Sequence, residues 1–481
     1  MLNTARSVAG VHWLFSHNDL GEGGSSGHFY RPVWVAWNWA IYKLFGADAV
    51  AFHLGSFLLF AALTLEVWAL VRLLAGEPAA WVAGFAFALW PRHGEAVAWL
   101  GGSPDLPAPL LTVSAVLWLY WIRRPWLAVG GAAVLGGAAA LGKEIAFVAP
   151  LLAALLLFAY PRERVRWLAP FAIAAAQLVV LIVRWQVVGG FGGYGYPLRA
   201  SRVAAALASY VLASVTPPQL ELAQALPFFL CALIVLGLVL AGVVSLYRRR
   251  ESERLRLAAV GGAWFVISLL PLVTLTVDLN DSNGERLLML ASVGVAMVAG
   301  ALIDLRARWV LAAAAVVLGV LCLTSAYTWV VAGRAERRII RQAVALGPPN
   351  TELVFLSAPS SYRNAHLFPQ PTMDYALHDA GRPDLTSAFC LQLHLRHLDR
   401  GAASVRTLTP GQVFAISTHR GAGIDVPVLR ETAPLTSECG YRPTSHGGWP
   451  PGLDPSAVVH PTPSRPATIV WFDGHDVRRC C

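Results

Sequence analysis

The sequence predicts an α-helical protein that crosses a membrane about ten times and ends in a small α/β domain. Of its 481 residues, 56% are hydrophobic and only 14% are charged, whereas soluble globular domains carry about 25% charged residues. The mean hydropathy is +0.55, and apolar runs recur at the ~20-residue length of a bilayer-crossing helix. This composition excludes a cytosolic enzyme, a disordered protein and a fibrous protein.

The predicted spans follow a polar, Gly/Ser-rich segment of 32 residues that has no signal-peptide pattern. An amphipathic stretch, Trp34–Phe45, is expected at the membrane interface. We therefore divide the chain into an outer loop with an interfacial helix (1–48), a multi-span domain (49–332) and a C-terminal domain (333–481). The ten apolar runs are 49–74, 79–92, 106–122, 126–142, 145–160, 167–187, 223–246, 257–276, 287–304 and 309–332.

Arginines indicate the orientation of these spans. They cluster in alternate loops, at 123–124, 162–166, 248–256 and 306–308, and such loops are cytoplasmic in membrane proteins. The formal charge of +9 therefore reflects topology and predicts no nucleic-acid partner. We expect the complementary loops, including 188–222, and the C-terminal domain to face outward. The Ala/Gly/Arg-rich composition suggests a bacterium, with the chain in the inner membrane and the C-terminal domain in the periplasm.

The fourth run contains closely spaced glycines, from Gly130 to Gly142, which we interpret as a close helix-packing surface. From about residue 349 the long apolar runs stop, and three β-rich runs, 351–358, 413–417 and 467–472, predict the α/β domain. Cys231 and Cys322 lie in apolar runs and are expected to be buried. An oxidising compartment permits disulfides among the remaining four, with the pairing left open: Cys390, Cys439, Cys480 and Cys481.

Ionisable residues concentrate at the outward ends of the apolar runs, where they are functional candidates. Each group also has a structural interpretation, such as capping, a turn or an interfacial anchor. We expect these ends to line one polar cavity at the outer surface. The groups are His17-Asn18-Asp19 with Glu22, His28, Tyr30-Arg31, Arg92-His93 with Glu95 and Asp105, Lys143-Glu144, and Asp278, Asp281 and Glu285-Arg286.

Four motifs carry a family resemblance. Residues 90–99 read WPRHGEAVAW, close to an HPxHxEAVAW pattern; 141–144 read LGKE; 285–294 read ERLLMLASVG; and Tyr30-Arg31-Pro32 precedes an amphipathic stretch. In this order they resemble the GT-C glycosyltransferases, closest to the O-mannosyltransferases that carry tetratricopeptide repeats. The resemblance covers residues 10–305, and the repeats are absent from the tail. Trp90 and Ser103 depart from the family pattern. Since members begin with a span followed by an acidic pair, we expect that a first span is missing before Met1.

The resemblance implies transfer of a sugar from a polyprenyl-phosphate donor to a protein or glycan acceptor hydroxyl on the outer face. It implies Asp19, with Glu22 behind it, as the catalytic base. The other residues implied in substrate binding are Tyr30, Arg31, His93, Glu95, Asp105, Lys143, Glu144, Glu285 and Arg286.

Two other functions stay open at this point: a secondary transporter or flippase of lipid-linked sugars, and a non-catalytic partner subunit related to the GT-C enzymes. A transporter favours charges near the membrane midplane and internally repeated halves, neither of which the sequence has. We expect no cofactor. A divalent metal is possible only weakly, because the phosphate leaves already charged and no metal-ligand spacing is present.

Overall fold

The computed structural model describes fifteen stretches of the chain, which fall into two compact units. The helical unit comprises Met1–Pro218, Phe229–Asp278 and Gly284–Leu323, and the strand unit comprises Gln219–Phe228, Leu279–Asn283 and Thr324–Cys481. The described residues are 8–17, 29–190, 198–222, 224–279, 283–304, 308–363, 365–367, 372–409, 413–419, 422–425, 439–443, 453–454, 456–461, 463 and 466–480.

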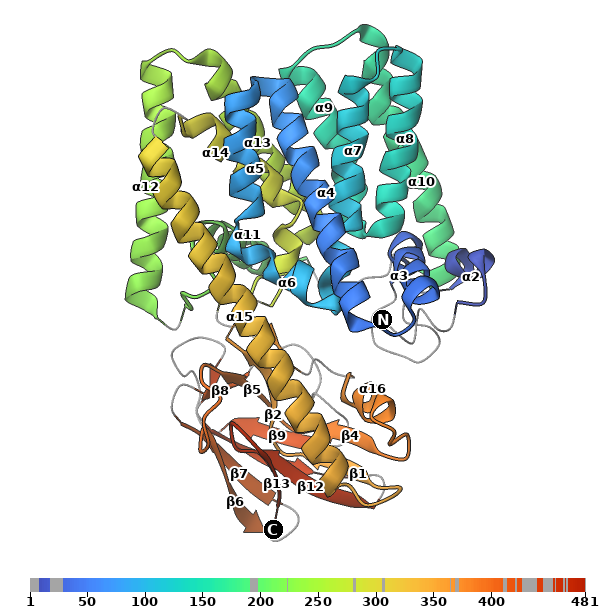
Figure 1. The fold of residues 1–481 in the computed structure, drawn as a ribbon, viewed down its shortest axis with the longest axis vertical. Coiled ribbons are helices and arrows are strands. Elements are labelled where there is room, and N and C mark those ends of the chain that lie inside the picture. Colours follow the sequence, from blue (N-terminus) through green and yellow to red (C-terminus); the bar gives the residue numbers. More distant parts are fainter. Residues whose placement is uncertain are drawn as a thin grey trace. The chain divides into compact units, whose positions relative to one another are not determined.

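The described part of the helical unit contains helices joined by turns and no strand, and most of the helices lie side by side as a bundle (Figure 1). Helices α12 and α15 continue into the strand unit. The helices are α2 Val11–Ser16, α3 Pro32–Phe45, α4 Ala49–Ala75, α5 Glu77–Ala88, α6 Gly94–Ala98, α7 Pro107–Trp121, α8 Pro125–Gly142, α9 Ala149–Ala159, α10 Ala169–Val188, α11 Ala200–Val215, α12 Ala225–Arg248, α13 Ser252–Leu269, α14 Ala291–Leu302 and α15 Arg308–Leu346. Short 3₁₀ turns join them: η1 Pro91–His93, η2 Leu100–Asp105, η3 Glu144–Val148, η4 Arg164–Leu168, η5 Leu270–Leu272 and η6 Glu285–Leu288.

Each of the ten predicted apolar runs coincides with a helix, which confirms the predicted fold class. Six helical segments of the described chain are long and apolar enough to cross a membrane: Ala49–Ala75, Pro125–Gly142, Arg164–Val188, Ala225–Arg248, Ser252–Leu272 and Ala312–Leu346. Others are shorter than predicted, because 3₁₀ turns replace their first residues; α14, for example, begins only at Ala291, after η6.

The glycines of α8 allow close packing, as predicted. A Cβ atom on Gly136 would lie 2.6 Å from Ile173 Cγ2 of α10, and one on Gly142 would lie 3.3 Å from Ala108 of α7. A second close approach joins α13 and α14, where a Cβ on Gly261 would lie 2.6 Å from the carbonyl oxygen of Gly294. These two helices therefore touch backbone to backbone.

Segment 188–222 was predicted to be a loop, and this prediction is wrong, because the segment contains helix α11. This helix buries Ala206, Tyr210 and Ala213 together with the polar residues Arg202 and Ser209, and it exposes Leu207 and Val211. A search for runs of about 20 apolar residues misses it, because it has only 16 residues. Helix α3 lies where the amphipathic stretch was predicted, with Trp34, Val35, Asn38 and Ile41 on its buried face.

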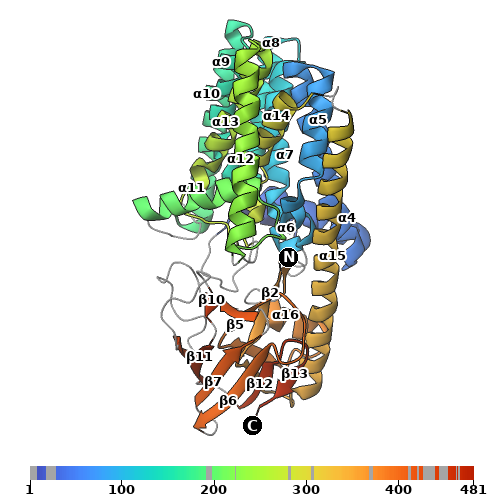
Figure 2. The ribbon, with the colours of Figure 1, turned by 90° about the vertical axis from the view of Figure 1, so that its left-hand side faces the viewer.

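The strand unit contains three sheets and the helix α16 Thr372–Asp379 (Figure 2). The sheet orders are β13-β12-β1-β4, β10-β8-β5-β2-β3 and β6-β7-β11-β9. The three β-rich runs predicted from the sequence fall on β1 and β2, on β7 and on β12. The strands are β1 Glu352–Phe355, β2 Ala358–Tyr362, β3 Ala365–His366, β4 Thr386–Phe389, β5 Gln392–Leu395, β6 Ala403–Thr409, β7 Val413–Thr418, β8 Ala422–Asp425, β9 Cys439–Pro443, β10 Leu453–Asp454, β11 Ser456–Pro461, β12 Ala467–Phe472 and β13 Val477–Arg479.

The core of this unit forms between the sheets and the second half of α15. Ala335, Ile339 and Ala343 of α15 are buried in one cluster with Phe355 of β1 and Phe472 of β12. The helix thus continues past residue 332, where the last apolar run was predicted to end. Cys390 and Cys480 are both disulfide-bonded, whereas Cys231 and Cys322 are free.

Glu221, in the strand unit, has Arg396 and His394 as neighbours. Its carboxylate accepts a hydrogen bond from Arg396 Nε at 2.5 Å and lies 3.8 Å from His394 Nε2. Burial alone raises the pKa of Glu221, but the neighbouring His394 and Arg396 outweigh this effect and lower it. The carboxylate therefore stays ionised in the folded protein.

Candidate functional site

The candidate site lies in the helical unit, where proline and glycine interrupt the helices. Between α5 and α7 the chain breaks into η1, α6 and η2, which contain Pro91, Gly101 and Pro104. Similar breaks occur at η3 and η6. Charged side chains at these breaks, together with Arg31 and Arg184, form three sets of ion pairs that we call the charge cluster: Arg92 with Glu285; Arg286 with Glu95 and Asp105, which also contacts Lys143; and Glu144 with Arg31 and Arg184. The sets are connected along the chain, because Lys143 and Glu144 are adjacent, as are Glu285 and Arg286.

Arg92 and Glu285 form the most deeply buried pair. Their side chains are each 1% exposed, and Arg92 Nη1 donates to Glu285 Oε1. Arg92 also donates through Nε to the carbonyl oxygen of Thr216, at 2.7 Å, and through Nη2 to its hydroxyl, at 3.1 Å. This pair therefore connects η1 with η6 and with the end of α11.

Glu95 holds the next segment of η6 in place. Its carboxylate accepts hydrogen bonds from the backbone N–H of Arg286 at 2.8 Å, from the backbone N–H of Gly284 at 3.3 Å, and from Arg286 Nη1. Gly284 has a left-handed φ of 93°, and a Cβ atom there would lie 2.9 Å from the carbonyl oxygen of Thr276. Only glycine fits this position without strain.

Asp105 connects Arg286 with Lys143. The same carboxylate oxygen, Oδ2, lies 2.5 Å from Lys143 Nζ and 3.5 Å from Arg286 Nε. Arg286 also stacks over the Trp99 ring, 5.0 Å from the ring centre, a favourable position for a cation. The two cations are therefore neighbours, although 142 positions of sequence separate them.

Glu144 closes the cluster on the side of α3 and α10. It lies 2.7 Å from Arg184 Nη2 and 3.5 Å from Arg31 Nη2. Its side chain is 28% exposed, compared with at most 1% for the side chains of Glu95, Asp105 and Glu285. It is thus the most accessible carboxylate of the cluster.

Burial divides the charge cluster into two parts. Arg92, Arg184 and three of the carboxylates are almost completely buried, while the side chains of Arg31, Lys143 and Arg286 are 9–14% exposed. Five cations face four carboxylates, so the cluster carries a surplus of positive charge. A partly open, positively charged surface supported by buried ion pairs is suited to binding an anion.

The remaining predicted residues lie beside the cluster. His93 is buried among the rings of Phe60, Phe87 and Trp90, and its Nε2 lies 3.0 Å from Ser292 Oγ. Tyr30 is also buried and donates its hydroxyl proton to the carbonyl oxygen of Phe15. Among the described residues, neither side chain forms a hydrogen bond with the charge cluster.

Asp19, Glu22, His28 and Asp281 lie outside the described residues, so the predicted base remains a prediction. Asp278 is described and lies between η5 and η6. Among the described residues, no group of three or more His, Cys, Asp or Glu side chains is arranged to hold a metal ion.

The sequence analysis missed Arg184 and Thr216. Arg184 had a signal, because it is a charge inside the apolar run 167–187. Thr216 had none, since its role depends on where α11 ends.

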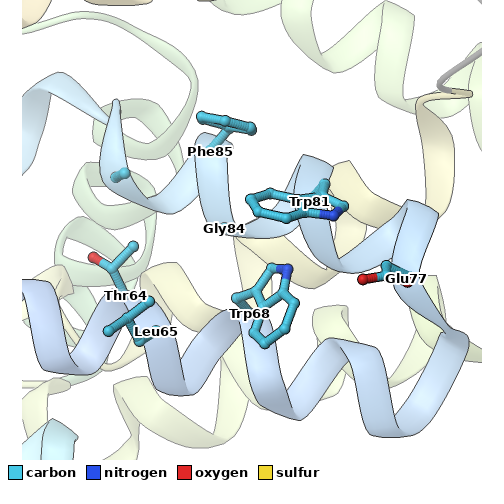
Figure 3. A pocket seen from close by; sticks show the side chains of 8 residues that line it. Thr64, Leu65, Trp68, Glu77, Trp81, Gly84 and Phe85 are labelled. Atoms are coloured by element: carbon cyan, nitrogen blue, oxygen red, sulfur yellow. The ribbon is translucent and has the colours of Figure 1, made fainter.

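An apolar groove runs between α4 and α5 in the same unit (Figure 3). Its volume is about 380 Å³, and the indoles of Trp68 and Trp81 lie on it with ring centres 5.6 Å apart. The groove is lined by Thr64, Leu65, Trp68, Glu77, Trp81, Gly84, Phe85 and Ala88. It therefore follows α5 up to Ala88, three residues before η1.

Sequence comparison gives one informative match. The chain is 37% identical over 160 residues to the protein O-mannosyl-transferase Tmtc2 of Drosophila melanogaster. This match confirms the resemblance to membrane O-mannosyltransferases. It covers 31% of this chain and 17% of the length of that relative. No protein-family model matches the chain. Among solved structures, ArnT from Cupriavidus metallidurans in the apo state aligns with a TM-score of 0.38 and 13% identity, over 73% of this chain and 75% of that chain.

Proposed function

We propose that this protein is a glycosyltransferase that moves a sugar from a polyprenyl-phosphate-linked donor to a hydroxyl group of a protein or glycan. The proposal rests on the match to an O-mannosyl-transferase and on the composition of the charge cluster. The reaction takes place at the outer face of a bacterial inner membrane, with the lipid bilayer as the environment of the donor. No nucleic acid and no cofactor take part.

The single observation that carries the proposal is the shared contact of Arg286 and Lys143 with Asp105 Oδ2. Two neighbouring, partly exposed cations match the size and charge of one phosphate group. Arginine binds phosphate through two parallel hydrogen bonds and lysine adds a point charge. In this proposal the buried residues Arg92, Glu95 and Glu285 position η6, so that Arg286 faces the donor.

The chemical step breaks the bond between the anomeric carbon and the phosphate oxygen while the acceptor oxygen bonds to that carbon. The leaving polyprenyl phosphate gains negative charge, which Arg286 and Lys143 stabilise more strongly in the transition state than in the donor. The acceptor hydroxyl loses its proton to a carboxylate, which acts as the general base.

Asp19, with Glu22 as the alternative, is the proposed base. Glu144 is a poor candidate despite its exposure, because two guanidinium groups, Arg31 and Arg184, lie against its carboxylate. Neighbouring positive charges stabilise the ionised form of a carboxylate and weaken it as a base.

The apolar groove between α4 and α5 is proposed to hold part of the polyprenyl chain. Its walls are aromatic and aliphatic side chains, with Trp68, Trp81 and Phe85 the largest (Figure 3). It ends near η1, whose Arg92 belongs to the charge cluster. A lipid tail in the groove would therefore lead its phosphate toward the cluster.

The test is transfer of radiolabelled sugar from a panel of polyprenyl-phosphate sugars, in membranes of a host that lacks the native gene. Arg286→Ala is expected to lower transfer roughly 100-fold, the usual effect of removing a group that stabilises transition-state charge, and to raise the donor KM. Arg286→Lys should retain part of the activity, because the charge remains.

The matched control is Arg254→Ala. Arg254 also forms an ion pair in the helical unit, 3.0 Å from Glu251, but its side chain is 28% exposed and lies outside the charge cluster. Its removal should leave transfer unchanged. If Arg286→Ala left the donor dependence unchanged, the phosphate site would be wrong. If Asp19→Asn/Glu22→Gln kept full activity, the base assignment would be wrong. If the wild-type protein were inactive with every donor, the result would favour a non-catalytic partner subunit.

A further inference from the structure

A second positively charged surface lies in the strand unit, on the C-terminal half of α15. Its arginines occur at positions 334, 337, 338 and 341, at spacings of three and four residues that place them on one helix face. A groove of about 560 Å³ is lined by Arg334, Arg337, Arg338, Ile340 and Arg341. We call this surface the arginine groove.

The charge of the arginine groove is balanced only in part, by Glu336, which is partly buried and interacts electrostatically with Arg337. Arg334, Arg337 and Arg341 are exposed and form no ion pair within 4.0 Å with any residue that the structure describes. Arg338 differs, because it donates to His475 through Nη1. Like charges three or four residues apart destabilise a helix, so the arrangement carries a cost that an anionic ligand would remove.

The arginine groove directly follows an apolar part of the same helix. Residues 309–333 contain no charged side chain. This uncharged run is longer than the ~20 residues needed to cross a bilayer. Within the strand unit, Tyr327 and Val330 are 64% and 49% exposed. Tyr327 lies three residues before Val330, and Val330 lies four residues before Arg334. The exposed apolar face of α15 therefore continues into the face that carries the arginines. Apolar contact and positive charge therefore adjoin where the helix leaves its apolar stretch.

We propose that the arginine groove binds the phosphate headgroup of an anionic membrane phospholipid, such as phosphatidylglycerol. The acyl chains lie along Tyr327 and Val330, and the phosphate lies among Arg334, Arg337 and Arg341. Guanidinium groups recognise phosphate by paired, charge-assisted hydrogen bonds, and basic residues next to a span attract anionic lipids. This site is separate from the charge cluster and does not depend on the proposed transfer activity.

The test uses the full chain in phosphatidylcholine nanodiscs that contain a small fraction of phosphatidylglycerol with a photoactivatable acyl chain. After illumination, labelled residues are mapped by mass spectrometry. Labelling is expected at Tyr327, Val330 and their neighbours, and it should exceed that by photoactivatable phosphatidylcholine. Arg334→Gln/Arg337→Gln should lower it roughly 30-fold at limiting lipid, and Arg334→Lys/Arg337→Lys should keep most of it.

The matched control is Arg406→Gln/Arg479→Gln. These two arginines are also exposed on the strand unit and form no ion pair with described residues, but they lie in β6 and β13. Labelling should match that of the wild type. Equal labelling by the two lipids, retained labelling in Arg334→Gln/Arg337→Gln, or equal loss in the control would overturn the proposal. Complete competition by inorganic phosphate would also overturn it, because the site would then take a soluble anion rather than a lipid.

Discussion

Glu95→Gln tests whether the buried half of the charge cluster holds η6 in place. The wild-type carboxylate accepts hydrogen bonds from the backbone of Gly284 and Arg286 and from the Arg286 guanidinium. Glutamine has nearly the same shape but replaces one acceptor oxygen with an NH₂ group. At least one of these donors then faces another donor, and the charge opposite Arg286 is lost.

The expected loss of stability is about 2–4 kcal/mol, from one charge-assisted hydrogen bond and one buried polar group left unsatisfied. Removing one partner of a fully buried ion pair costs about 3–5 kcal/mol. We expect the lower range because the side chain of Arg286 is 14% exposed and retains a second carboxylate partner, Asp105, at 3.5 Å. In a chain of 481 residues, with an unfolding entropy of about 2 cal/mol/K per residue, the loss corresponds to a decrease of about 2–4 °C in the unfolding temperature.

The assay is thermal unfolding in detergent, followed by the fluorescence of the 18 tryptophans. The control is Glu251→Gln, which removes a carboxylate from a half-exposed pair with Arg254. Such a pair contributes about 0–1 kcal/mol, so the unfolding temperature should change little. If Glu95→Gln unfolded at the same temperature as Glu251→Gln, the reasoning that the buried ion pairs position η6 would be refuted.

Three further predictions follow from single contacts. Gly284→Ala should lower the unfolding temperature and abolish transfer, because a left-handed φ costs about 1–2 kcal/mol for alanine and its Cβ meets a carbonyl oxygen. Gly189→Ala, with φ 75° but open space around the Cβ, should cost less; equal losses would contradict the steric argument. Glu221→Gln should destabilise the protein at neutral pH, since the pKa of Glu221 is lowered in the folded state. The difference in unfolding free energy between this variant and the wild type should shrink as the pH falls below the ordinary carboxyl pKa. A difference that does not depend on pH would refute this prediction. Trp34→Phe should cost about 1–2 kcal/mol by breaking its buried 2.9 Å hydrogen bond to Ser103, measured by thermal unfolding, and an unchanged unfolding temperature would count against that bond.

The sequence predicted the helical fold well, because long uncharged runs have few alternatives to a helix in a membrane. It predicted less of the strand unit, in which most strands are short. β10, for example, has two residues, Leu453–Asp454, and pairs with β8. Such strands are defined by their partners and leave little periodicity in the sequence.

The same distinction applies to the site. The sequence indicated Glu95, Lys143 and Arg286 as charged residues at span ends, because charge is unusual there. It could not indicate that Lys143 pairs with Asp105 or that Arg92 pairs with Glu285. Those partners lie 38 and 193 residues apart, and only the packing of the helices brings them together.

The glycine contact between α13 and α14 limits how the candidate site can move. No side chain separates Gly261 from Gly294, and Trp264 of α13 donates a hydrogen bond to the carbonyl oxygen of Leu290, at 3.0 Å, just after η6. Sliding one helix along the other would drive larger side chains into this contact. A gating motion that withdraws Arg286 must therefore move α13 and α14 together as one rigid body.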